Sequence, residues 1–97
     1  MKAYELLLLL NPSLDEEANA AVLDKLQGVI TADGGVVDKL EPWGKRKLAF
    51  EIEKLTEGDY TLIDFHTAPS AIAELDRVLH ITDGVVRYML LAREDRD

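Results

Sequence analysis

Apolar positions along the chain form segments that alternate between strand-like and helix-like spacing. The first segment, residues 3–10, is an almost unbroken apolar run that includes consecutive leucines from Leu6 to Leu10. Such a run is too short for a typical helix, and it predicts a strand that is covered on at least one face. Asn11-Pro12 follows directly and is expected to end this strand.

Helical spacing begins after this turn and predicts a helix over residues 14–32. Ser13 and Glu16 have the spacing of a capping box, in which the hydroxyl accepts from the Glu16 amide and the carboxylate reaches back. Asp33-Gly34-Gly35 is expected to end the helix, because glycine suits a left-handed cap. The apolar stripe, about 140° wide, comprises Ala18, Val22, Leu23, Leu26, Val29 and Ile30.

The middle of the chain predicts two further strands and a turn. Residues 36–43 have the pattern of a strand, which Gly44 interrupts with a bulge or a bend. Alternation of apolar and polar positions resumes over residues 47–53. Residues 56–59, Thr-Glu-Gly-Asp, have the composition of a turn, and residues 60–67 alternate again as a strand.

A second helix is expected to begin at Pro69, since proline suits a first helical turn. Residues 82–84, Thr-Asp-Gly, then turn the chain into a last strand over residues 85–92, and a charged tail begins at Arg93. The apolar stripe of this helix consists of Ile72, Leu75 and Leu79.

The order strand, helix, strand, strand, helix, strand predicts an α+β fold. Two right-handed crossovers place both helices on one face of a four-stranded antiparallel sheet, which is the ferredoxin-like βαββαβ sandwich. The chain shows no repeat or linker, so one domain is expected over residues 1–97. The expected core consists of Leu6, Leu8, Leu26, Ile30, Ile63, Phe65, Leu75, Leu79, Tyr88 and Leu90.

Composition and charge narrow the possible settings of this fold. The 97 residues suffice for one modest core, and the absence of cysteine excludes disulfides and favours a reducing, cytoplasmic location. The leucine run is shorter than the roughly 7–15 apolar residues of a signal-peptide core or the roughly 20 of a membrane span. The formal net charge of −8 repels phosphate, which taken alone argues against an autonomous nucleic-acid-binding protein.

Three stretches of sequence nevertheless carry a family resemblance that covers nearly the whole chain. They are Tyr4-Glu5 with Asn11-Pro12 and Leu14-Asp15, then Trp43-Gly44-Lys45-Arg46-Lys47-Leu48-Ala49-Phe50-Glu51-Ile52, and finally Glu74-Leu75-Asp76-Arg77 with Val85 and Arg87. In these stretches the chain resembles bacterial small-subunit ribosomal protein six, most specifically in the middle one. The resemblance implies a non-enzymatic structural subunit, without a cofactor, that binds the central domain of small-subunit ribosomal RNA together with ribosomal protein eighteen. Family members are often acidic overall, with a locally basic binding edge.

Lys45, Arg46 and Lys47 form the densest basic run in the chain. Side chains of this kind can contact phosphate oxygens without reading a base. The alternative is a solvated hairpin edge whose charges oppose edge-to-edge aggregation. The resemblance favours RNA contact and extends the expected RNA-binding set to Lys2, Arg87 and Arg93. Because the first and last strands are expected to run antiparallel, it is open whether Lys2 and Arg87 share one patch.

A second surface is expected on the face of the sheet that the helices leave bare. It is expected to show the apolar side chains of Leu7, Leu9, Leu62, Met89 and Leu91 among those of Glu5, Asp64, His66 and Arg87. A bare apolar face usually meets a partner, here either ribosomal protein eighteen or a second copy of the chain. Trp43 either stacks on a base or packs on the partner, or it is a half-buried anchor of the hairpin. The expected partner-binding residues are Trp43, Leu62 and Met89.

Two other classes of function compete with the ribosomal one. A small acyl-phosphate hydrolase would need an arginine or a glycine-rich cradle after the first strand, and Asn11-Pro12-Ser13 supplies neither. An acidic regulatory or ligand-binding module that dimerises through its sheet is compatible with the charge and the bare face. His66 and His80 stand apart from other ligand residues in sequence, so no metal site and no enzyme are expected.

Overall fold

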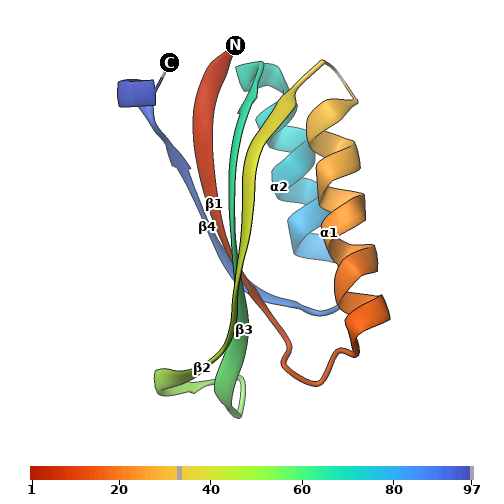
Figure 1. The fold of residues 1–97 in the computed structure, drawn as a ribbon, viewed down its shortest axis with the longest axis vertical. Helices are drawn as coiled ribbons and strands as arrows, with labels where there is room; N and C mark the ends of the chain where they lie inside the picture. Colours follow the sequence, from red (N-terminus) through yellow and green to blue (C-terminus); the bar gives the residue numbers. More distant parts are fainter. Residues whose placement is uncertain (33, 97) are drawn as a thin grey trace.

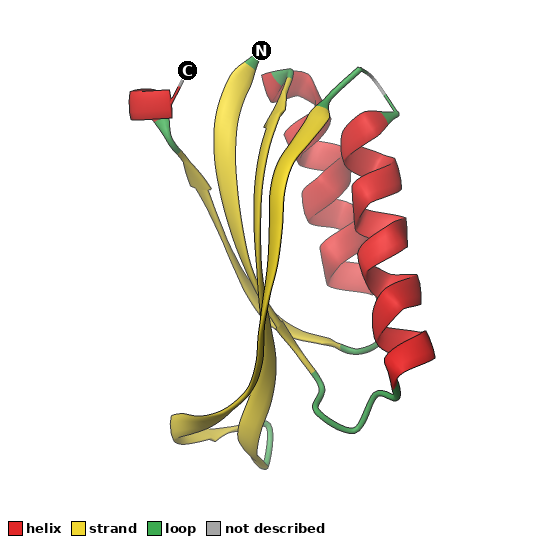
Figure 2. Ribbon diagram, viewed as in Figure 1, coloured by secondary structure: helices red, strands yellow, loops and turns green. Residues whose placement is uncertain are grey.

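The protein is described by a computed structural model, which covers residues 1–32 and 34–96. Its elements in chain order are β1 Lys2–Leu10, α1 Glu16–Thr31, β2 Val36–Ile52, β3 Leu55–Thr67, the short 3-10 helix η1 Pro69–Ala71, α2 Ile72–Ile81, β4 Val85–Ala92 and the 3-10 turn η2 Glu94–Arg96. The four strands form one antiparallel sheet in the order β2-β3-β1-β4. Figures 1 and 2 show α1 and α2 together on one face of this sheet. The predicted ferredoxin-like architecture is therefore confirmed.

The start of α1 differs from the predicted capping box. The cap is Asp15, whose carboxylate oxygen Oδ1 accepts from the backbone N–H of Ala18 at 2.7 Å. Ser13 instead donates its hydroxyl to Oδ1 of Asn11 at 2.7 Å, within a turn that the backbone N–H of Leu14 closes on the Asn11 carbonyl. The capping box was wrong because two residues able to cap occur close together, and the turn engages the first of them.

The end of α1 and the following turn agree with the prediction in part. The helix ends at Thr31, and the N–H of Ala32 still bonds to the carbonyl of Gly28 at 3.0 Å. Gly34 has a φ of 85°, the left-handed conformation expected of glycine at such a turn. Asp33, the first residue of the predicted terminator, lies outside the described residues.

The β2–β3 hairpin is longer than predicted and turns at another place. Residues 56–59 were expected to form the turn, but they belong to β3. The connection consists of Glu53 and Lys54, whose φ values of 49° and 68° correspond to the two-residue turns that suit the twist of a hairpin. Gly58, which suggested a turn, is buried under Leu9 instead. The predicted irregularity at Gly44 is confirmed, because the register shifts between Pro42 and Gly44.

The core lies between the helices and the sheet, as the apolar stripes predicted. Eight of the ten expected residues are fully buried, while Tyr88 and Leu90 are only partly buried. Both of these lie on β4, an edge strand with a neighbouring strand on one side only. The buried cluster also includes three residues that were not expected, namely Leu10, Val22 and Val78.

Candidate nucleic-acid and partner interface

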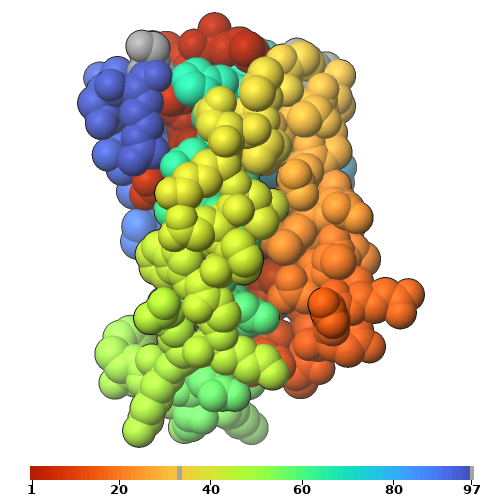
Figure 3. All heavy atoms as spheres, in the orientation of Figure 1, coloured from red at the N-terminus to blue at the C-terminus, as the bar shows by residue number. Residues whose placement is uncertain are grey.

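The basic run occupies the part of the β2–β3 hairpin that extends past the helices (Figure 1). Lys45, Arg46 and Lys47 are all exposed, as expected. In the register with β3 they lie opposite Asp59, Gly58 and Glu57. Figure 3 shows the hairpin as a protruding lobe at the end of the molecule opposite the C-terminal residues.

The side chains of this basic run do not all point to one surface. The guanidinium of Arg46 lies 5.8 Å from the ring centre of Trp43, on the side of the sheet away from the helices. Lys45 instead lines a surface depression together with Asp15, the cap of α1, and Glu16 in its first turn. The run therefore offers cations on both sides of the hairpin.

Arg87 and Lys2 lie at different ends of the sheet. Arg87 pairs with Leu9 near the hairpin, whereas Lys2 pairs with Thr67 at the opposite end. At about 3.4 Å per residue, the strand between Lys2 and Leu9 spans roughly 24 Å. Arg87 therefore lies toward the hairpin end of β4, the edge strand opposite to β2, and Lys2 lies at the other end of the sheet, so these two residues do not share one patch.

Arg93 is held by carboxylates of its own chain. Its guanidinium lies 3.1 Å from Glu5 and 3.3 Å from Asp95. The hydrogen bond that Arg93 donates to the Asp95 carboxylate, together with the negative charge of that carboxylate, raises the pKa of Arg93 above its ordinary value. The cation predicted for RNA contact is therefore already neutralised within the protein.

The bare side of the sheet, which we call the open face, collects the three expected partner-binding residues. Across the strands, Leu62, Leu7 and Met89 stand in one row. The ring of Trp43 lies 6.3 Å from that of Tyr60, which lines a shallow hollow with Leu7 and Met89. Trp43, Leu62 and Met89 thus share one surface, and Met89 is 55% exposed.

Trp43 is fixed on this face by polar contacts as well as by stacking. Its indole N–H donates to the Glu41 carboxylate at 2.8 Å, and Lys39 forms an ion pair with the same side chain at 2.8 Å. The bonds from Lys39 and then from Trp43 lower the pKa of Glu41. With 39% of its surface exposed, Trp43 is an oriented surface residue.

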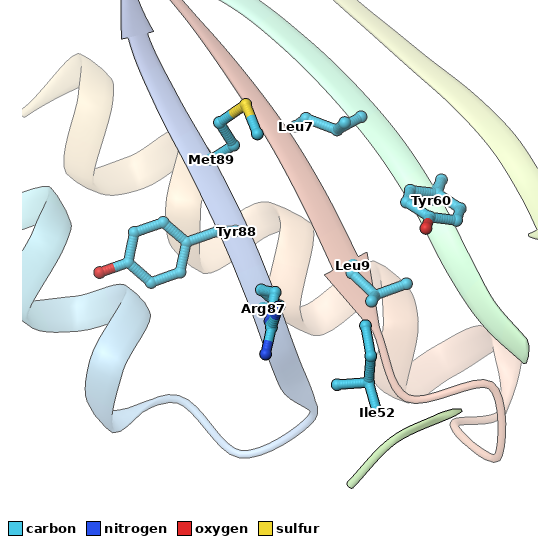
Figure 4. A pocket seen from close by; sticks show the side chains of 7 residues that line it. All are labelled: Leu7, Leu9, Ile52, Tyr60, Arg87, Tyr88 and Met89. Atoms are coloured by element: carbon cyan, nitrogen blue, oxygen red, sulfur yellow. The ribbon is translucent and has the colours of Figure 1, made fainter. Parts of the chain in front are cut away.

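The hollow at the hairpin end of the open face has a volume of about 170 Å³ and is mostly apolar. Figure 4 shows Arg87 at its edge, with Leu9 and Ile52 beside it and the ring of Tyr88 turned away. The seven lining residues are Leu7, Leu9, Ile52, Tyr60, Arg87, Tyr88 and Met89. The sequence alone did not place Tyr60 on the open face, although its spacing of two residues from Leu62 along β3 puts both side chains on the same side of the sheet.

Possible metal ligands are dispersed among the described residues. No group of three or more potential ligands occurs among them. His66 does have a carboxylate neighbour, Asp38, and its other ring nitrogen contacts the Arg96 carbonyl at 3.2 Å. None of the helices in residues 1–32 and 34–96 is long and apolar enough to cross a membrane.

Fold and surface together define a ferredoxin-like α+β domain with a basic hairpin and an apolar open face. The sequence profile of the family described as Ribosomal protein S6 matches residues 3–92. The chain belongs to this family. A small ribosomal subunit protein bS6 from Clostridium novyi is 53% identical over 94 residues, which cover 97% of this chain and 99% of the relative. Its counterpart from Clostridium beijerinckii is 50% identical over 91 residues, covering 94% and 96%.

Solved structures agree with this assignment. The crystal structure of 30S ribosomal protein S6 from Thermotoga maritima superposes with a TM-score of 0.92 at 31% identity, covering 98% of this chain and 90% of that one. The C-terminal domain of the MgtC protein from Mycobacterium tuberculosis has a TM-score of 0.65 at 12% identity, covering 100% and 93%. The latter similarity shows a shared fold alone.

Proposed function

We propose that the chain is a structural component of the small ribosomal subunit and binds the central domain of its RNA together with ribosomal protein eighteen. The observation that carries this proposal is the near full-length relationship to proteins named small ribosomal subunit protein bS6. A non-enzymatic role is part of the proposal. Two surfaces of the chain support it, one cationic and one apolar.

The cationic surface addresses how a chain with a net charge of −8 can bind RNA. At physiological salt, charges act over a Debye length of about 8 Å, so the charges near a contact govern phosphate binding more than the net charge of the whole chain does. Lys45, Arg46 and Lys47 project from the protruding hairpin, and Arg87 lies at the same end of the sheet. We assign phosphate contact first to these four residues. Lys2 and Arg93 would contribute only to a separate contact at the other end.

The apolar surface provides a place for the partner protein. Trp43, Leu62 and Met89 lie on the open face, where an apolar contact would remove Met89 and its neighbours from water. A basic partner would also supply the cations that this acidic chain lacks. Self-association through the same face is the competing outcome.

The proposal is tested by co-sedimentation with small subunits depleted of their own protein six, in the presence of ribosomal protein eighteen. The chain is expected to restore stoichiometric binding. A Met89→Asp variant is expected to lose cooperation with the partner, whereas Ala73→Asp, which adds the same charge on the exposed side of α2, is expected to bind normally. Failure of the unmodified chain to sediment with the subunits, or a stable homodimer through the open face, would contradict the assignment.

A further inference from the structure

Residues 93–96 turn back over the sheet after β4. The backbone N–H of Arg93 donates to the carbonyl of Ala3 at 2.8 Å, which fixes the start of the turn beside β1. Figure 1 shows η2 on the side of the sheet away from the helices, at the end where the N-terminus also lies. The turn therefore covers one end of the open face.

Two acidic side chains lie beneath this turn. Glu5 and Asp64 are directly opposite each other in the β1–β3 register, and each side chain is only 19% exposed. Like charges in such a position oppose strand pairing, and partial burial weakens their hydration. Nearby cations would therefore reduce the repulsion between these two carboxylates.

The turn supplies these cations. Arg96 reaches both carboxylates, with its Nη1 atom 3.2 Å from Glu5 and 3.0 Å from Asp64. Arg93 adds a second contact to Glu5 at 3.1 Å. The Arg96 carbonyl contacts the His66 ring at 3.2 Å, so backbone and side chains both bind the turn to the sheet.

We propose that η2 is an electrostatic strap, closed over Glu5 and Asp64 in the free protein and able to open without unfolding the domain. The ion pairs are partly exposed to solvent, so salt weakens them. The turn contributes none of the fully buried core residues, so its release leaves the core packed. Opening uncovers the two carboxylates and changes the charge at this end of the open face from neutralised to acidic.

Limited trypsin digestion of the full chain tests the strap, because cleavage after Arg93 requires the turn to leave the sheet. A Glu5→Gln/Asp64→Asn variant is expected to be cut after Arg93 about tenfold faster than the unmodified chain, since several weak contacts are lost together. High salt is expected to accelerate cleavage of the unmodified chain and to have little effect on the variant. Glu74→Gln, which removes a comparable exposed ion pair with Arg77 on α2, is the control and should change nothing.

A second variant separates strap opening from a general loss of stability. Arg96→Gln alters only the turn, and it is expected to accelerate cleavage after Arg93 while leaving the urea midpoint unchanged. Hydrogen exchange should show faster exchange of the Arg93 amide and unchanged exchange in β1. Equal cleavage rates in all proteins, or acceleration only in variants whose urea midpoint falls, would overturn the proposal.

Discussion

Two glycines, one within α1 and one in the connection from α1 to β2, give a sharp test of how this helix packs. Gly28 lies on the exposed side of α1, and a Cβ atom added there would meet nothing within 4 Å. Gly35 lies just before β2, and a Cβ atom there would fall 2.1 Å from the carbonyl oxygen of Ile30. The same substitution by alanine is therefore expected to have opposite effects at the two sites.

The magnitude at Gly35 follows from what surrounds the added atom. Real Cβ contacts essentially never fall below 3.0 Å, and the obstructing Ile30 oxygen belongs to the helix backbone. On the other side, Oγ1 of Thr67 at 2.9 Å and the His66 carbonyl oxygen at 3.0 Å block an escape toward β3. The end of α1 and the start of β2 must separate by about an ångström to admit the added atom. This is expected to lower the free energy of unfolding by about 3 kcal/mol or more, the upper end of the range for overpacking.

At Gly28, alanine is expected to stabilise the protein by about 0.5–1 kcal/mol through the lower backbone entropy of the unfolded chain. Urea unfolding followed by circular dichroism measures both variants. At about 4–8 °C per kcal/mol for a domain of this size, Gly35→Ala should lower the melting temperature by about 12 °C or more. A Gly35→Ala protein within about 1 kcal/mol of the parent would refute the tight approach of α1, β2 and β3.

Other predictions concern the core, the helix cap and one tyrosine. Leu26→Ala and Leu75→Ala, at positions that are 0% and 1% exposed, should each lower the free energy of unfolding by about 2–5 kcal/mol, and urea melts showing less than about 1 kcal/mol for both would disprove their central packing. Asp15→Ala should lower the free energy of unfolding by about 0.5–2 kcal/mol, whereas Ser13→Ala should lower it much less. Equal losses for the two variants would indicate that Ser13 caps the helix after all. Burial, together with a hydrogen bond to a carboxylate, raises the pKa of Tyr88 from 10.0 to about 12. The contribution of neutral Tyr88 to stability is complete below pH 10 and is lost as the pH rises toward 12. An ultraviolet titration of the unmodified protein should therefore show one tyrosine that ionises later than the others, and Tyr88→Phe should remove it. An unmodified protein without such a tyrosine would contradict this environment of Tyr88.

The order of elements was accessible from the sequence because helical and strand periodicities are local properties. The turn positions were less accessible. Glu53 and Lys54 adopt positive φ values without the glycine or asparagine that usually signals such a turn, whereas Gly58 carries the signal without the turn. Its small size serves close packing against Leu9 instead. The amino-acid composition therefore predicted correctly that a hairpin forms, but the predicted position of its turn was wrong.

The candidate site also has features that the sequence predicted and features that it did not. That Leu62 and Met89 share a face follows from alternation along two strands, and the register confirms this placement. The neutralisation of Arg93 by Glu5 could not be predicted, because it joins residues from opposite ends of the chain. Only the three-dimensional fold shows which cations are already engaged and which project into solvent.

Replacing the cations of the hairpin in an RNA-binding experiment tests the proposed function most directly. RNA of the central domain is titrated with the protein over a range of salt, with and without ribosomal protein eighteen. The protein alone is expected to bind weakly, and the three cations at residues 45–47 would contribute about −2 to −3 to the log–log salt slope if each contacts one phosphate. Tight binding is expected only together with the partner.

The decisive comparison in this titration is between two variants of equal net charge. Lys45→Ala/Arg46→Ala/Lys47→Ala removes three exposed cations of the hairpin, while Lys25→Glu/Arg77→Ala lowers the net charge by the same amount on the helices. The account predicts that the hairpin variant folds normally but loses most of its affinity for the RNA–partner complex, and that the helix variant binds like the parent. Tight RNA binding by the unmodified protein alone, or undiminished assembly by the hairpin variant, would show that the RNA surface lies elsewhere.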